Sequence, residues 1–155
     1  MMRRTGAAAL ALTALAGAGM ADGTVLAEVY SNNGSLPPPY HQHMRLTIAE
    51  DGTVTLRACE GYGDDACITR RGIAPPPALD AIRAAAAASG LAERPAVDDP
   101  APHVGGSSTS GYVILGGQRI VLPAFPVTDD HGRVRAVMSA VMAAVPAEMP
   151  HADLP

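Results

Sequence analysis

The chain has 155 residues, a net charge of −4 at pH 7, only 3% aromatic residues and two cysteines. Its length is that of one domain. Its acidic balance and complete lack of lysine argue against binding to nucleic acid or to an anionic membrane surface.

The first 21 residues have the pattern of a secretory signal peptide. Arg3 and Arg4 form a positive start, an apolar run spans 7–16, and Gly19 and Ala21 supply the small residues of a cleavage site. The apolar run is too short for a membrane span. We expect cleavage after Ala21, a periplasmic or extracellular location, and no stable membrane anchor after cleavage. Nine arginines and fifteen acidic residues would then remain, a net charge of −6.

The mature chain begins with a predicted strand over 24–30, followed by the turn residues of 31–35. Three consecutive prolines at 37–39 predict an extended, stiff segment. Such a run acts as a spacer or, less often, docks into an aromatic groove of a partner.

Apolar and polar residues then alternate with a period of two, the pattern of half-buried strands. The residues Glu50-Asp51-Gly52 have the chemistry of a three-residue hairpin loop with glycine in the left-handed conformation. This loop sets Ile48 opposite Val54 and Leu46 opposite Leu56 on one apolar face.

The next hairpin brings Cys59 opposite Cys67, and two cysteines in an exported chain predict a disulfide. In this register the cysteines share the polar face, so the disulfide is expected to be a surface staple. The same register sets Arg70 on the apolar face, and we therefore expect the fourth strand to end or bulge near that residue.

Two helices and a further hairpin complete the predicted elements. Prolines at 75–77 and the alanine-rich run that ends at Ser89 predict a helix closed by Gly90. Gly116-Gly117 predicts a two-residue turn between strands at 112–115 and 118–122. A second helix, capped by Thr128 or Asp130, has one apolar stripe up to Val145.

The pattern predicts an α+β fold: a single antiparallel sheet of about six strands, with two helices packed on one face, in the order β-β-β-β-α-β-β-α. Residues 22–146 form the single domain, and 147–155 are expected to be a flexible tail. The irregular connection over 93–110 holds several prolines and glycines and is either functional or mobile.

His41 and His43 are the candidate metal ligands. Residues two apart at the start of a strand point to the same side, so both imidazoles could reach one ion. No further ligand stands at a suitable spacing, and the alternative interpretation is a pair of solvent-exposed histidines.

The loop 103–110 is the candidate catalytic segment. His103 and the hydroxyl side chains of 107–110 suggest a hydrolase with Asp98 or Asp99 as the orienting carboxylate. The strand-turn-helix context of a nucleophile elbow is absent from this stretch, which favours a flexible loop.

Tyr112, Ile114, Arg119 and Val121 are the candidate partner-binding residues. The Gly116-Gly117 turn directs them away from the face that the helices cover, so they form either an exposed apolar patch or the floor beneath a loop. We therefore predict an exported, disulfide-stapled, non-catalytic binding or inhibitor-like module that needs no cofactor. A periplasmic metal-handling protein that uses His41 and His43 is the first alternative, and a small hydrolase that uses 103–110 is the second.

Overall fold

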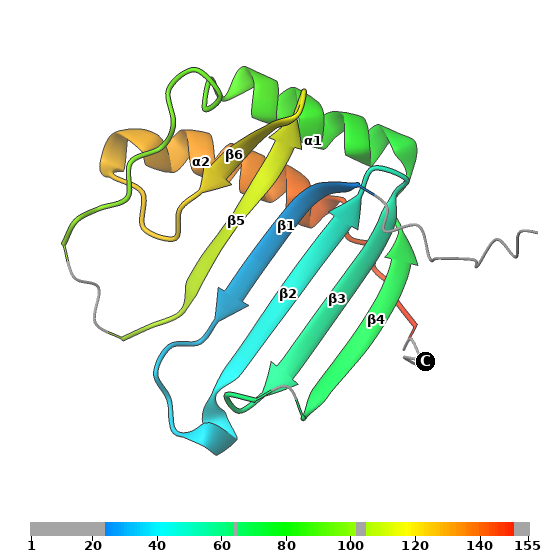
Figure 1. Cartoon of the computed structure of the whole chain (residues 1–155), viewed down its shortest axis with the longest axis vertical. Coiled ribbons are helices and arrows are strands. Elements are labelled where there is room, and N and C mark those ends of the chain that lie inside the picture. The colour runs from blue at the N-terminus through cyan, green and yellow to red at the C-terminus, as the bar shows by residue number, and fades with distance from the viewer. Residues whose placement is uncertain (1–23, 64, 102–104, 151–155) are drawn as a thin grey trace, which may run out of the picture.

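The computed structural model describes residues 24–63, 65–101 and 105–150, and the predicted signal peptide and His103 lie outside them. Six strands form one antiparallel sheet in the order β4-β3-β2-β1-β5-β6, with helices α1 (Pro76–Ala88) and α2 (Thr128–Ala143) on one face (Figure 1). The strands are β1 (Val25–Asn32), β2 (Gln42–Ala49), β3 (Thr53–Glu60), β4 (Cys67–Ile73), β5 (Ser108–Leu115) and β6 (Gln118–Leu122). The predicted fold class and element order are confirmed.

The hairpin registers follow from turn chemistry and alternation. Ile48 lies opposite Val54, and Gly52 adopts the predicted left-handed conformation with φ 89°. A side chain at Gly52 would also meet the backbone oxygen of Ala74, so both conformation and space call for glycine there. The predicted register of the β3–β4 hairpin is likewise confirmed, with Cys59 opposite Cys67.

Strand β5 begins earlier than predicted. The residues from Ser108 to Gly111, which we expected to be loop, pair with β1 in the middle of the sheet. Ser108 accepts a hydrogen bond from the Asn32 side chain, and Gly111 lies so close to β1 that a Cβ there would come within 2.4 Å of the Glu28 carbonyl oxygen. The small residues are therefore those of a tightly paired strand, and not of a flexible loop.

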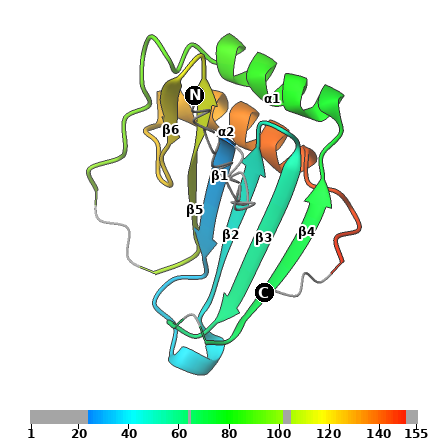
Figure 2. The same cartoon turned by 45° about the vertical axis from the view of Figure 1, so that its right-hand side comes forward.

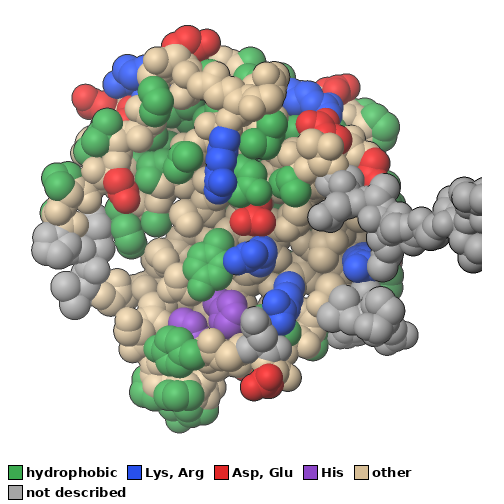
Figure 3. Space-filling view, in the orientation of Figure 1, with side chains coloured by type: hydrophobic (Ala, Val, Ile, Leu, Met, Phe, Trp, Pro, Cys, Tyr) green, Lys and Arg blue, Asp and Glu red, His purple; other side chains and the backbone are tan. Residues whose placement is uncertain are grey.

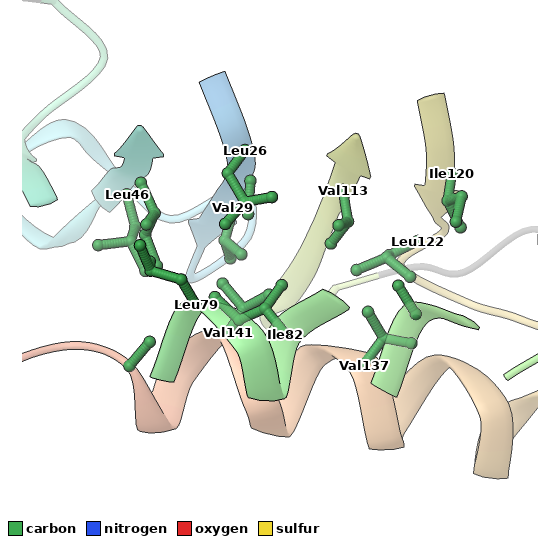
Figure 4. Close-up of a cluster of buried hydrophobic side chains, with 14 of the residues drawn as sticks. Leu26, Val29, Leu46, Leu79, Ile82, Val113, Ile120, Leu122, Val137 and Val141 are labelled. Atoms are coloured by element: carbon green, nitrogen blue, oxygen red, sulfur yellow. The ribbon is translucent and has the colours of Figure 1, made fainter. Parts of the chain in front are cut away.

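The core lies between the sheet and the two helices. Figures 1 and 2 show both helices crossing the same end of the sheet, where the β2–β3 hairpin also lies. Figure 4 shows side chains of β1, β2, β5 and β6 pointing toward side chains of α1 and α2. The core residues that are no more than 2% exposed include Leu26, Leu46, Ile48, Ile82, Val113, Ile120, Leu122, Val137 and Val141. Within the described ranges, neither helix is long and apolar enough to cross a membrane.

Two local expectations were wrong. Strand β4 continues past Arg70 to Ile73 without a bulge, since β4 is an edge strand where the arginine stem can lie along the sheet while its charge reaches water. The proline run is not fully extended: Pro38–Tyr40 forms a 3-10 turn, in which the Tyr40 and His41 backbone amides both donate to the Pro37 carbonyl oxygen.

The start of α2 also differs from the prediction. No side chain caps this helix, and Asp130 is instead 1% exposed. Its carboxylate accepts hydrogen bonds from the Val97 amide at 2.9 Å and from Arg133 at 2.5 Å, and lies 3.3 Å from Arg94. The hydrogen bond from Arg133, and then that from the Val97 amide, hold the pKa of Asp130 below its usual value. Asp130 thus ties the long connection to α2.

The chain after α2 returns to the edge of the sheet. Met149 packs against the core, and the Arg71 amide donates to the carbonyl oxygen of Pro150 at 3.3 Å. The predicted flexible tail therefore contacts β4 as far as Pro150, and the remaining five residues lie outside the described part of the chain.

Candidate functional site

The outer face, by which we mean the side of the sheet opposite the helices, carries the candidate binding residues. Figure 3 looks onto this face, where arginine and histidine side chains gather over the middle and the lower end of the sheet. Neither helix covers the outer face, because both helices pack on the other side of the sheet.

The four predicted partner-binding residues lie together on β5 and β6. Tyr112 is opposite Val121, and Ile114 is opposite Arg119. Val121 is 56% exposed, whereas Tyr112 and Ile114 are half-buried. The Arg119 guanidinium lies over the Tyr112 ring, 3.7 Å from its centroid, in a cation–π contact.

Charge is distributed unevenly between the outer face and the rest of the molecule. The registers place Arg45, Arg57, Arg71 and Arg119 on this face. Within the six strands, Glu28 is the only acidic residue with the same orientation. Four arginines against one glutamate give the strand residues of this face a formal charge of +3, although the whole chain has a net charge of −4.

The disulfide lies on the outer face at the end far from the helices. Cys59 and Cys67 are joined with a Cα–Cα distance of 4.0 Å, which confirms the predicted bond. The prediction that this disulfide lies on the surface is wrong for Cys59, which is only 4% exposed. The cysteine pair is therefore a packed part of this end of the sheet.

His41 has a structural role beside the disulfide hairpin. Its ring is 6% exposed and stacks on Tyr62 at 3.9 Å between centroids. Its Nδ1 must carry the proton, because it donates to the Gly34 carbonyl oxygen at 2.8 Å. The Tyr62 hydroxyl in turn donates to the Leu36 carbonyl oxygen at 2.6 Å. These contacts hold the β1–β2 connection against the β3–β4 hairpin.

The two candidate metal ligands are neighbours, but the structure adds no third ligand to them. The ring centroids of His41 and His43 are 5.6 Å apart. Among the described residues, no group of three or more histidines, cysteines and carboxylates is arranged to hold a metal ion. His41 is also buried, and not solvent-exposed, so both sequence interpretations of this pair need correction. The metal-handling alternative thus has no support among the residues that the structure describes.

The described residues of the candidate hydrolase segment take part in strand and turn hydrogen bonds. Ser108 and Thr109 lie in β5, where they form hydrogen bonds with Asn32 and Ser31 on the neighbouring strand. Asp99 accepts a hydrogen bond from the Ala101 amide within its own turn. His103 lies outside the described residues, so the catalytic hypothesis stays a prediction without geometric support.

A cavity of about 710 Å³ lies at the disulfide end of the sheet. Apolar Met44, Ala58 and Ile68 line it together with Gln42 and Glu60. Ile68 is 48% exposed because the strands extend beyond the helices here. The lining mixes carboxylate, amide and apolar groups and does not converge on one kind of ligand.

Sequence reasoning missed a second group of outer-face residues. A cavity of about 310 Å³ is lined by Tyr30, His43, Arg45, Arg57 and Cys59. The hairpin register already implied that Arg45 faces Arg57, because it set Leu46 opposite Leu56. The proximity of Tyr30 was hidden, since it depends on the pairing of β1 with β2.

Comparison with models of known protein families and with the curated proteins finds no match to this sequence. The geometry and charge of the outer face are therefore the features that point to a function.

Proposed function

We propose that the protein is an exported, non-catalytic binding module, and that its outer face captures a protein partner that presents acidic groups. The observation that carries this proposal is the formal charge of +3 among the strand residues of a face that neither helix covers, in a chain whose net charge is negative. Opposite charges on two surfaces accelerate their encounter and suppress wrong partners.

The patch on β5 and β6 supplies the anchors for such a contact. Tyrosine and arginine are the residue types that most often dominate binding energies, and flanking aliphatic groups exclude water from them. We expect the Arg119–Tyr112 contact to restrict both side chains before binding, which lowers the entropy lost on association. Ile114 and the exposed Val121 provide the aliphatic surround.

The proposed location outside the cytoplasm has two supports. The first 21 residues have the pattern of a signal peptide, and the disulfide is a bond that persists in oxidising compartments. Mass spectrometry of the secreted protein tests this part. The mature chain should begin at Asp22 and lack two cysteine hydrogens, whereas an uncleaved chain or free thiols would contradict the proposed location.

Partner capture from a periplasmic extract tests the binding proposal. Arg119→Glu should abolish capture, because it reverses a charge and removes the cation–π contact from the centre of the patch. Arg135→Glu is the matched control, since it makes the same charge change at an exposed position on α2, on the other side of the sheet. Added salt should weaken capture by the wild type. Equal losses with both variants would contradict a role for the outer face.

A further inference from the structure

The two edges of the sheet differ in what lies beside them. At the β4 edge, the chain that follows α2 runs along the strand, and the Arg71 amide donates to the Pro150 carbonyl oxygen at 3.3 Å. A Cβ at Gly72 would come within 3.1 Å of both Pro146 and Met149 of the same segment. At the β6 edge the strand order ends, and the described residues contain no further strand beside β6 (Figure 1). The β6 edge is therefore the open one.

The hairpin turn determines which backbone groups of β6 face this open side. The two-residue turn at 116–117 makes Leu115 and Gln118 a hydrogen-bonded pair, and such pairs alternate along an antiparallel ladder. Arg119 and Val121 therefore belong to the non-hydrogen-bonded pairs, and their N–H and C=O groups point away from β5. Outside the sheet, no backbone hydrogen bond among the described residues involves either of them. Two donors and two acceptors thus face the open edge.

The side chains of the same two residues lie on the outer face. Directly opposite residues of an antiparallel pair share a face, so a strand added to β6 would set every second side chain beside Arg119 and Val121. None of the ion pairs among the described residues includes Arg119, whose guanidinium lies on the Tyr112 ring. A carboxylate at the opposite position would supply the ion pair that Arg119 lacks there.

Charge also decides between the two kinds of strand that could occupy this edge. Antiparallel pairing of β6 with a second copy would bring the two Arg119 side chains to opposite or diagonal positions of one face, where like charges repel. A charged residue on a short edge strand is a common protection against such self-pairing. An acidic strand is instead attracted by the same side chain, so the edge favours an acidic partner over a second copy.

We propose that the acidic partner docks by strand addition: an extended segment with acidic residues at every second position pairs with β6 as a seventh strand. This inference rests on the proposed function and adds the conformation of the partner and its place of contact. Backbone hydrogen bonds to Arg119 and Val121 supply affinity, and the alternating carboxylates supply selectivity. The five residues of β6 match a segment of about the same length.

The probe is an acetylated and amidated hexapeptide that alternates glutamate and valine. It is titrated into the mature, disulfide-bonded protein at pH 7, and the exchange of backbone amide hydrogens is followed by NMR. At saturation, the amides of Arg119 and Val121 should exchange at least about tenfold more slowly, because they become hydrogen-bond donors.

Two modified peptides separate backbone pairing from attraction between charges. N-methylation of a central glutamate removes a donor that faces β6 but keeps every charge, and it should weaken binding about tenfold, the loss of one hydrogen bond. N-methylation of the adjacent valine is the matched control and should weaken binding at most about threefold, because its N–H points away from β6.

A pair of variants at one position makes the same comparison on the protein. Val121→Pro removes the amide that faces the open edge but no hydrogen bond of the sheet, so it should keep its circular dichroism spectrum and bind about tenfold more weakly. Val121→Thr keeps the amide and the branched shape, and should bind at most about threefold more weakly. If Val121→Pro does not fold, the two N-methylated peptides decide alone.

The outcomes distinguish strand addition from the proposed function. Binding that survives both Val121→Pro and N-methylation of the glutamate, but is lost in Arg119→Glu, would overturn strand addition and leave the acidic partner in place. Equal binding by Arg119→Glu would overturn both proposals. No saturable binding of the hexapeptide, or amides of Arg119 and Val121 that are already protected from exchange in the free protein, would overturn strand addition alone.

Discussion

The two faces of the sheet carry different kinds of side chain, although both are built from the same strands. On the helix side, Leu46, Ile48 and Val54 are at most 1% exposed and pack into one apolar core. On the outer face, the alternating positions of the same two strands carry Arg45, Thr47, Thr55 and Arg57, and no helix covers them. The helix side therefore accounts for folding, and we propose that the outer face serves binding. This difference is the physical basis of the proposed function.

The largest effect should come from the helix side. Leu46→Ala removes a side chain that is 1% exposed, and it should lower the free energy of unfolding by about 2–5 kcal/mol. The adjacent outer-face variant Thr47→Ala should change it by at most about 0.5 kcal/mol. Urea denaturation of both variants provides the measurement. Similar losses in the two proteins would mean that the outer face is also part of a core.

The disulfide is an exception to this division, because it stabilises the protein although it lies on the outer face. Cys59→Ser should lower the free energy of unfolding by about 2–3 kcal/mol in the chain-entropy model, since the bond closes a short loop. The fold should remain, because the core lies at the opposite end of the strands. Chemical denaturation combined with circular dichroism measures both quantities. Complete loss of folded structure would show that the disulfide end is not independent of the core.

Acid should destabilise the protein through Asp130, on the helix side. The folded-state pKa of this carboxyl is lowered, so its contribution to stability is fully present above its ordinary pKa of 3.8 and is lost as the pH falls through the lowered value. The melting temperature should therefore drop on acidification below about pH 4. Asp130→Asn should already be less stable at neutral pH and should show a smaller drop. An identical pH profile for both proteins would remove Asp130 from this explanation.

The smallest stability effect is expected for the outer-face arginines, and its sign is informative. Arg45→Thr removes one of two like charges that lie directly opposite each other, so it should raise the free energy of unfolding by up to about 0.5 kcal/mol. Arg57 and its other interaction stay in place. Thermal melting at low salt makes the difference largest. A loss of more than about 1 kcal/mol would mean that Arg45 serves the fold and not partner binding.

Local sequence rules account for much of this structure. Turn residues such as Gly52 and the alternation around Leu46 were enough for the hairpin registers, the disulfide and the face that carries Tyr112. The pairing of β1 with β5 was not predictable, because it joins residues such as Asn32 and Ser108 that are far apart in the chain. The buried role of Asp130 was equally hidden, since a carboxylate at a helix start has an ordinary local explanation.

Some residues of the outer face could likewise be predicted from local sequence, and others could not. The shared face of Tyr112, Ile114, Arg119 and Val121 was predicted from one hairpin, because a two-residue turn fixes which side chains lie together. The cavity at Tyr30 and His43 requires three neighbouring strands, and only the sheet order brings these strands together.

The most direct test of the functional account measures stability and binding on one protein, the double variant Tyr112→Ala, Ile114→Ser. If the outer face serves binding, this variant keeps its circular dichroism spectrum and a cooperative melting transition but no longer captures the proteins that the wild type retains from periplasmic extract. Unfolding of the variant would show that these side chains belong to the core. A folded variant that captures the same proteins as the wild type would contradict the assignment of this face to partner binding.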